Sequence, residues 1–191
     1  FFARIDEFDA AFFRISPREA ELMDPQQRLL LELCWGVLED AGYKPSVMNG
    51  SDTGVFIGAC HFDYRQLLEE QGLSAEALAA TGTSGSILAN RLSYFYNLQG
   101  PSMLVDTACS SSLMAVHEAA RALRDGSCAQ ALVGGVNLIC HAMNTLAYDK
   151  AGMLSKDGVC YTFDARANGY VRGEGAALLF LKPLDQAMRD H

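Results

Sequence analysis

The sequence lacks any hydrophobic segment long enough to cross a membrane as a helix. Such a helix needs about 20 consecutive apolar residues, and the longest apolar runs here, ALVGGVNLIC and GAALLFL, have only the length of strands. The opening segment FFARIDEFDAAFF carries charges early and has no small-residue cleavage pattern, so we expect no secretory signal there. We therefore predict no membrane partner.

Positive charge is also scarce. The sequence holds 15 Lys and Arg residues against 23 Asp and Glu residues, a formal net charge of −8. Phosphate binding needs clustered Lys and Arg, so this balance predicts no nucleic-acid partner. Hydrophobic residues make up 50% of the chain and charged residues 20%, a composition typical of a folded globular protein rather than a disordered one.

The six cysteines lack the spacing of a disulfide framework or a zinc site. Most of them lie inside apolar segments, which is typical of free cysteines in a reducing compartment, and we predict a cytoplasmic protein. Two adjacent pairs, Cys60-His61 and Cys140-His141, offer four possible metal ligands. Neighbouring residues on a strand point to opposite faces, however, and no C-x2-C or H-x3-H pattern occurs, so we predict no metal site.

Alternating strand and helix patterns predict an α/β fold. Nearly continuous apolar runs separated by helices indicate a mostly parallel sheet covered on both faces. The predicted strands span residues 53–60, 102–108, 131–139 and 176–184. The predicted helices span residues 25–41, 84–97 and 111–126, with a short helix near 74–80, and residues 1–23 and 140–175 are expected to be irregular.

The first long helix has clear predicted ends. Asp24 can cap it, Pro25 suits the first helical position, and Gln27 lies where a capping-box partner belongs. Gly42 stops the apolar repeat of this helix, and Gly126 stops that of the helix starting near residue 111.

The strongest chemical signal is Cys109, which lies between a predicted strand and a predicted helix in VDTACSSSLMAVHEAARAL. Its small neighbours permit a tight turn like the nucleophile elbow of a hydrolase. A helix N-terminus offers free amide N–H groups and partial positive charge, which favour the nucleophilic thiolate. The same amides, that of Cys109 included, suit a developing oxyanion on a thioester carbonyl. Taken alone, Cys109 could instead be a small residue that fills a tight turn.

Two glycine-rich segments have ordinary structural interpretations. GTSGS at 82–86 hints at a phosphate-binding loop but lacks the Gly-Lys-Ser/Thr ending, so we interpret it as a helix cap with tight packing. Turns and close backbone approach explain the glycines of GYVRGEG. We expect Glu174, which lies between two of them, to hold the loop by hydrogen bonds and not to act in catalysis.

The segment DTACSSSL resembles the active-site signature of polyketide-type beta-ketoacyl synthases, members of the thiolase superfamily. Further segments resemble blocks of that family in family order: SPREAELMDPQQRLLLE (16–32), GVFIGA (54–59), GPSMLVDTACSSSL (100–113), ALVGGVNLI (131–139), AGMLSKDG (151–158) and ANGYVRGEGAALLFLKPL (167–184). The resemblance covers nearly the whole chain and favours the catalytic interpretation of Cys109. It implies the first half of a thiolase-like αβαβα layered fold within a modular type I polyketide synthase.

The resemblance also implies a ping-pong condensation. Cys109 would accept an acyl or polyketide chain from the phosphopantetheine arm of an acyl carrier protein. A malonyl-type extender on a second carrier would then lose carbon dioxide and attack the Cys109 thioester, giving a 3-oxoacyl product. A cysteine here, and not a glutamine, implies chain extension instead of decarboxylative loading. A homodimer that pairs through SMLVDT is implied as well, and no metal or redox cofactor is.

Some parts of the family pattern are missing from the 191 residues. Motifs resembling EAHGTGT and KSNIGH, which supply two histidines and a lysine for decarboxylation, are absent. His117 lies roughly 12 Å along the helix from Cys109 at ~1.5 Å per residue, too far to substitute, and we interpret it as a helix-packing residue. Nothing in the sequence positions the terminal His191. We therefore expect these residues alone to be inactive in condensation.

A family strand like IAIVGMACRFP, expected at the centre of the half-sheet, is absent too. A sheet without its middle strand would leave two edges unpaired, so we expect residues 1–191 to be a partial domain that folds poorly alone. Tyr148-Asp149 stands where the family usually has Phe-Ser, and Tyr161 stands where lysine is common. By analogy these positions lie near the acyl entrance. They could alter chain preference, although drift on a tolerant surface is the simpler interpretation.

Two other functions stay open at this point. The domain could transfer acyl chains without elongating them, or it could be an inert dimeric scaffold in a megasynthase. Two histidines in sequence beyond residue 191 would favour condensation. The absence of a covalent adduct at Cys109 would favour the scaffold.

Overall fold

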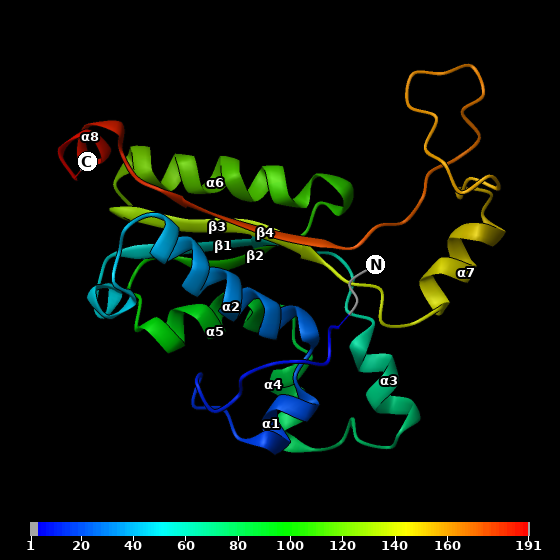
Figure 1. Cartoon of the computed structure of the whole chain (residues 1–191), viewed down its shortest axis with the longest axis horizontal. Coiled ribbons are helices and arrows are strands. Elements are labelled where there is room, and N and C mark those ends of the chain that lie inside the picture. The colour runs from blue at the N-terminus through cyan, green and yellow to red at the C-terminus, as the bar shows by residue number, and fades with distance from the viewer. Residues whose placement is uncertain (1–3, 191) are drawn as a thin grey trace.

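The computed structural model describes residues 4–190 and shows a four-stranded sheet between helices (Figure 1). β1 runs parallel to both β2 and β3, whereas β4 runs antiparallel to β3. The predicted α/β class with a mixed, mostly parallel sheet is therefore confirmed. In sheet order the strands are β2 (Ser102–Val105), β1 (Thr53–Gly58), β3 (Gln130–Asn137) and β4 (Gly175–Leu181).

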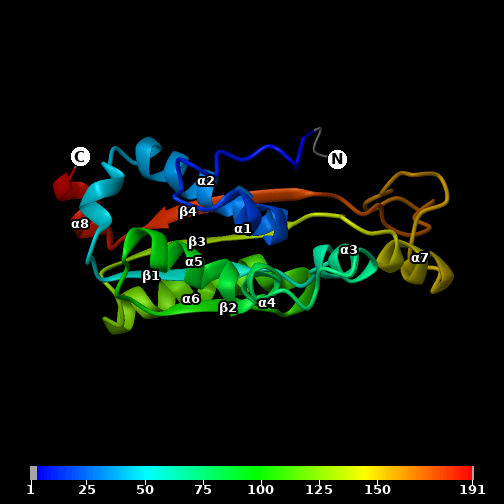
Figure 2. The same cartoon turned by 90° about the horizontal axis from the view of Figure 1, so that it is seen from below.

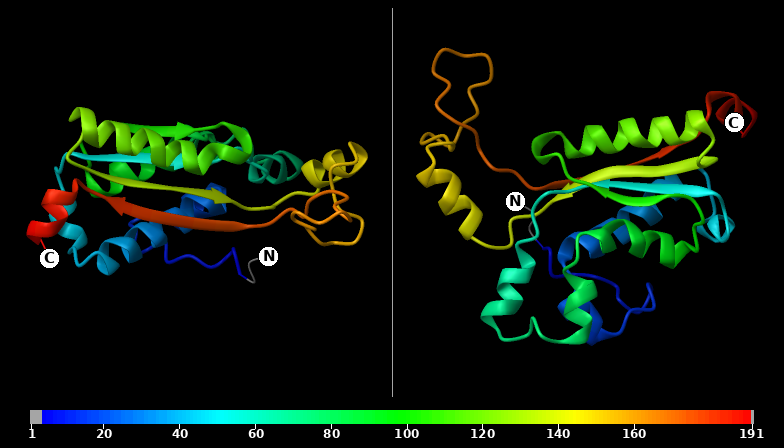
Figure 3. Two further views of the ribbon diagram at one scale, coloured as in Figure 1. Left: turned by 90° about the horizontal axis from the view of Figure 1, so that it is seen from above. Right: turned by 180° about the vertical axis from the view of Figure 1, so that it is seen from behind.

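Long helices cover both faces of the sheet. α2 (Pro25–Asp40) and α5 (Ser86–Tyr96) lie on one face, and α6 (Ser111–Asp125) lies on the other (Figures 1 and 3). Shorter elements connect them: α1 (Pro17–Leu22), η1 (Pro45–Met48), α3 (Tyr64–Glu70), α4 (Ala77–Gly82), η2 (Ala108–Ser110), α7 (Met143–Lys150) and α8 (Leu184–Asp190).

The two faces of the sheet are packed differently. Under α2 and α5, large apolar side chains surround Val55 and Ile57 of β1. Under α6, the buried helix residues are the alanines Ala115, Ala119 and Ala122, which cluster with Phe56 and Val133. Small side chains let a helix approach a sheet closely, so α6 lies tightly on the strands.

The expectation of a half-sheet without its central strand is wrong for the described residues. β1 and β3 occupy the middle of the sheet, and each is hydrogen-bonded on both sides. Every residue of β1 is buried, as a central strand requires. β2 and β4 form the edges, and Leu179 of β4 is 48% exposed. Chain order does not give spatial order, and the strands present pair without a gap.

The N-terminal cap of α2 forms as predicted, but the capping box does not. Asp24 accepts a hydrogen bond from the Gln26 amide over 2.8 Å. Gln27 instead donates through its side-chain amide to the carbonyls of Thr81 and Gly82, and the Asp24 amide also donates to Gly82. A contact with the end of α4 thus replaces the local hydrogen bond expected from the sequence.

Helices α1, α3 and α7 were not predicted. α1 begins with a Ser16 cap and Pro17, a start signal hidden among aromatic and charged residues. α3 buries only Leu68, and α7 buries no residue. Neither helix therefore has the strong apolar repeat by which a helix is predicted from sequence. α7 lies beyond the end of the sheet toward which β1 and β3 run, and α8 lies at the other end (Figure 2).

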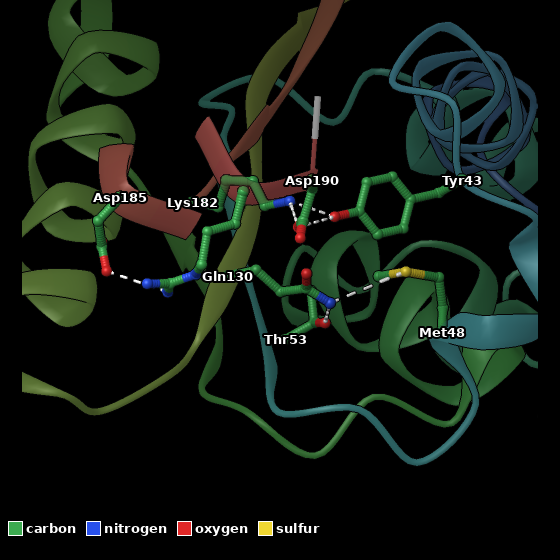
Figure 4. Close-up of polar contacts among 8 residues, drawn as sticks. Tyr43, Met48, Thr53, Gln130, Lys182, Asp185 and Asp190 are labelled. Atoms are coloured by element: carbon green, nitrogen blue, oxygen red, sulfur yellow. Dashed lines mark hydrogen bonds and ion pairs between the residues drawn. The ribbon is translucent and has the colours of Figure 1, made fainter. Parts of the chain in front are cut away.

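The chain end of α8 is tied to the core by a small polar cluster (Figure 4). Lys182, just after β4, donates to both the Tyr43 hydroxyl and the Asp190 carboxylate. Tyr43 also donates to Asp190 over 3.0 Å. Residues from the α2–η1 connection and from both ends of α8 therefore meet at one point.

Candidate active site

The chain turns from β2 to α6 over residues 106–110, and Cys109 lies within this turn. Ala108 adopts a left-handed backbone conformation with φ of 55°. For a residue with a Cβ this conformation costs about 1–2 kcal/mol, and it persists where the surroundings hold it. The turn is therefore a strained strand-to-helix connection, as the small residues around Cys109 predicted.

Hydrogen bonds within the turn hold this conformation. The Ala108 amide donates to Asp106 Oδ1 over 3.0 Å. Ser111 Oγ accepts from the Thr107 amide over 3.0 Å and donates to the Ala108 carbonyl over 2.6 Å. Because Ser111 is only 5% exposed, these bonds are shielded from water and fix the start of α6.

Two glycines let the start of α6 contact the sheet directly. A Cβ on Gly58, the last residue of β1, would come within 2.5 Å of the Ser112 amide nitrogen. A Cβ on Gly135 of β3 would come within 2.8 Å of Ser112 Cβ. Neither distance is possible for a real side chain, so the position of the helix N-terminus depends on glycine at both sites.

The structure places Cys109 where the sequence predicted it, directly before α6, and its side chain is exposed. The amide groups at the start of α6 and the helix dipole lie at this turn. An exposed thiol next to a helix N-terminus is arranged for attack on a carbonyl group that arrives from solvent.

A second set of polar side chains lies at the same end of the sheet as Cys109, where β1 and β3 end. We call these residues, His61, Asn137, Tyr148 and Arg172, the His61 group. His61 Nε2 lies 2.8 Å from Tyr148 Oη, and His61 Nδ1 lies 3.1 Å from Asn137 Oδ1. The Arg172 guanidinium lies over the Tyr148 ring, 5.4 Å from its centroid. Sequence reasoning missed this group because its members come from four separate segments. Polar residues at or just after the carboxyl ends of parallel strands were the signal that could have grouped His61 with Asn137.

The family described as "Beta-ketoacyl synthase, N-terminal domain" matches residues 1–187 of this chain. The chain belongs to the beta-ketoacyl synthase family. Polyketide synthase PksN of Bacillus subtilis is 52% identical over 183 residues, which are 96% of this chain and 3% of that protein. The 6-methylsalicylic acid synthase of Aspergillus terreus is 50% identical over 190 residues, which are 100% of this chain and 10% of that protein.

Solved ketosynthase structures share the fold of this beta-ketoacyl synthase chain. The ketosynthase from module 6 of the bacillaene synthase of Bacillus subtilis 168 has a TM-score of 0.90 and 43% identity, over 100% of this chain and 32% of that one. An oxazolomycin ketosynthase domain of Streptomyces albus has a TM-score of 0.91 and 43% identity, over 98% of this chain and 33% of that one. The chain thus spans about a third of these domains and shares the N-terminal domain of modular type I polyketide synthases.

Other predicted residues of this beta-ketoacyl synthase chain have mixed outcomes. His117 is exposed on α6, so its interpretation as a packing residue is wrong; the buried face of α6 is set by the alanines. Glu174 Oε1 accepts from the Ile139 amide over 2.8 Å, which confirms that it holds the loop. A Cβ on Gly82 would come within 2.1 Å of the Leu22 carbonyl oxygen, which confirms tight packing at 82–86, whereas no side-chain hydrogen bond caps α5 at Gly85. His191 lies outside the described residues.

The Cys-His pairs do not lie on strands, contrary to the expectation. Cys60 and His61 follow β1, and Cys60 Sγ lies 3.3 Å from His61 Nδ1. His141 Nε2 lies 3.0 Å from Glu70 Oε1. Within residues 4–190 no three His, Cys, Asp or Glu side chains gather as metal ligands would, and no helix is long and apolar enough to span a membrane.

One cavity of the described chain lies away from Cys109. It measures about 770 Å³ and lies between the segment preceding α1 and the helices α2 and α5. Its lining combines aromatic side chains, among them Phe12, Trp35 and Phe95, with polar ones such as Glu19 and Arg91. None of the residues of the β2–α6 turn lines it, so it is not the site of chemistry at Cys109.

Proposed function

We propose that this chain is the nucleophile-bearing N-terminal part of a ketosynthase domain, in which Cys109 accepts an acyl chain from an acyl carrier protein. The observation that carries the proposal is the exposed Cys109 thiol in a strained turn at the N-terminus of α6. Membership of the beta-ketoacyl synthase family supports it. No cofactor of its own is needed, because the substrate brings the phosphopantetheine thioester.

In the first step the Cys109 thiolate attacks the thioester carbonyl carbon of the carrier-bound acyl group. Backbone amides at the start of α6, that of Cys109 included, donate to the oxyanion of the tetrahedral intermediate. The intermediate collapses, the carbon–sulfur bond to phosphopantetheine breaks, and the released thiolate takes up a proton. The acyl chain is then a thioester of Cys109.

In the second step a malonyl-type extender on a second carrier loses carbon dioxide. The resulting enolate carbon attacks the Cys109 thioester and expels the Cys109 thiolate, which leaves a 3-oxoacyl chain on the carrier. By family resemblance this step needs two histidines and a lysine, which the motifs of these 191 residues do not supply. Condensation is therefore proposed for the complete domain.

Two features support the further proposals of a homodimer and a reducing environment. β2 is an edge strand of the described sheet, and Met103 in it is 39% exposed, so its outer side is open to a second copy across a two-fold axis. All six cysteines are free thiols, and we propose a cytoplasmic megasynthase.

The test is acyl transfer to the complete domain from an acyl-pantetheine thioester, followed by intact-protein mass. The native domain should gain one acyl group, the Cys109→Ala variant none, and the Cys160→Ala variant, which removes the other exposed thiol, one. An adduct without a 3-oxoacyl product after malonyl-carrier is added would favour the non-elongating alternative. The absence of any adduct at Cys109 would overturn the proposal and favour an inert scaffold.

A further inference from the structure

The His61 group and Cys109 lie at the same end of the sheet, where β1 and β2 end and β4 begins. Burial raises the pKa of the Cys60 thiol, the charges of Asp106 and Cys109 raise it further, and Arg172 lowers it. Cys60 in turn lies 3.3 Å from His61 Nδ1. Cys60 and Cys109 both follow parallel strands at one edge of the sheet, and the Arg172 segment enters β4 at that same edge.

The hydrogen bonds of the His61 group define which of its atoms donate. Asn137 Nδ2 donates to the Gly173 carbonyl over 2.7 Å, so Asn137 Oδ1 is the atom that faces His61 Nδ1 at 3.1 Å. An amide oxygen only accepts, so the His61 tautomer that fits this contact has its proton on Nδ1. In that tautomer Nε2 is an acceptor, and it accepts a hydrogen bond of 2.8 Å from the Tyr148 hydroxyl.

Two atoms of the group keep unused hydrogen-bonding capacity. Tyr148 Oη donates its only proton to His61, so its lone pairs remain acceptors. Arg172 Nη1 donates to Thr145 Oγ1 over 2.6 Å. Arg172 Nη2, however, is shielded from solvent and has no partner among residues 4–190. A buried donor without a partner is unfavourable, which points to an acceptor on a ligand.

We propose that Tyr148 and Arg172 form a specificity subsite for a hydroxyl group on the acyl chain held by Cys109; the proposal rests on the proposed function of Cys109. A hydroxyl group both donates and accepts, so it matches Tyr148 Oη and Arg172 Nη2 together. The Arg172 guanidinium lies over the Tyr148 ring, 5.4 Å from its centroid, so the two side chains lie next to each other. His61 and Asn137 are positioning residues, because they fix the direction of the Tyr148 hydroxyl.

Other functional groups on the acyl chain match the subsite less well. A methylene group makes no hydrogen bond and leaves Arg172 Nη2 unpaired. A carbonyl or carboxylate oxygen would accept from Arg172 but would bring its lone pairs against those of Tyr148 Oη. Of these groups only the hydroxyl satisfies both sides.

The test compares two substrates in the complete ketosynthase domain: 3-hydroxybutanoyl-pantetheine and butanoyl-pantetheine, which differ in one hydroxyl group. The rate of Cys109 acylation is followed by intact-protein mass. The native domain should prefer the hydroxylated chain, and Tyr148→Phe should lower the ratio of the two rates about 5-fold, since one neutral hydrogen bond is worth about that factor. Arg172→Lys, which keeps the charge, should lower the ratio as well.

Tyr170→Phe is the matched control. Tyr170 packs near the Tyr148 ring, at 6.4 Å between centroids, and makes no described hydrogen bond to the His61 group, so the variant should keep the native ratio. An unchanged ratio in Tyr148→Phe overturns the subsite while leaving acylation of Cys109 intact. An equal loss for both substrates also overturns it, because the group would then contact the shared pantetheine arm. If neither substrate acylates the native domain, the proposed function of Cys109 is overturned, and the subsite proposal with it.

Discussion

Gly58 lies directly against Ser112: a Cβ on this glycine would meet the Ser112 amide nitrogen at 2.5 Å. Gly58 ends the central strand β1, and Ser112 lies in the first turn of α6. Through this contact β1 packs directly against the N-terminus of α6, which lies next to Cys109. The geometry of the β2–α6 turn therefore depends on glycine at position 58.

Replacement of Gly58 by alanine should displace the start of α6. Overpacking of this kind costs about 1–3 kcal/mol of folding free energy, and acylation of Cys109 should fall with it. Denaturant unfolding and acyl loading of the complete domain measure the two effects. Gly36→Ala is the control, because Gly36 is exposed on α2 with open space around its Cβ position. That variant should be neutral or about 1 kcal/mol more stable. Equal changes in unfolding free energy and in acyl loading for Gly58→Ala and Gly36→Ala would contradict the prediction.

The buried cap residue Asp24 should make stability depend on pH. The pKa of Asp24 is raised from 3.8 to about 6, mainly by burial; hydrogen bonds from Gln26 and the charge of Arg28 oppose the rise, and the charge of Asp63 adds to it. Because the folded state holds this proton more tightly, the stabilising contribution is complete below pH 3.8 and is lost as pH rises through about 6.

Asp24→Asn keeps a capping oxygen but cannot ionise, so it should be more stable than the native domain at pH 7, by at most about 3 kcal/mol, and similar at pH 4. Denaturant unfolding of the complete domain at both pH values measures this difference. Asp24→Ala is the control, since it loses both the cap and the titration. If the difference in unfolding free energy between the native domain and Asp24→Asn is the same at both pH values, Asp24 does not titrate in this range.

The cysteines should differ strongly in reactivity. Burial raises the pKa of Cys34 and of Cys140 to about 12 in each case, which leaves almost no thiolate near pH 8. Cys109 and Cys160 are exposed. Iodoacetamide followed by peptide mass mapping should therefore modify Cys109 and Cys160 first, and Cys34 and Cys140 only after unfolding. Rapid modification of Cys34 in the native domain would contradict the described core.

The Lys182 cluster should hold α8 in place. Lys182→Met removes the donor to Tyr43 and Asp190 while keeping the apolar stem, so the amides of residues 184–190 should exchange with deuterium faster. Arg189→Ala is the control, because it removes only an exposed ion pair with Asp185 on the same helix. Faster exchange in both variants to the same extent would show that Lys182 has no special role.

Residues 1–191 on their own should unfold without a cooperative transition. Large apolar side chains remain exposed across the described chain, including Leu113 at 75%, Phe163 at 105% and Leu184 at 74%. Exposed surface of this kind favours association over a single folded state. Thermal unfolding followed by circular dichroism tests this, with the complete domain as the control. A sharp, reversible transition in the segment alone would refute it.

The sequence predicted those features that local patterns determine. The apolar run of β1, the Asp24 cap and the position of Cys109 before α6 each depend on neighbouring residues. It did not predict features set by distant contacts. Gln27 turns to α4 instead of its own helix end, and His61 finds partners 76 and 87 residues away. Sheet order was also missed, since local patterns do not reveal which strands become neighbours.

Because β4 runs antiparallel to β3, the connection between these two strands leaves the sheet and returns to it at the same end. Asn137 and Gly175 face each other as partners across the two strands, so the chain leaves the sheet and returns to it at one point. The segment in between, which includes α7, Tyr148 and Arg172, lies outside the sheet and is held there by side-chain contacts, among them Tyr148 with His61 and Asn144 with Asp63. Such a segment can be lengthened, shortened or exchanged between homologous enzymes while the hydrogen-bonded strands stay unaltered. Residue changes in this segment can therefore leave the strands that position Cys109 unaltered.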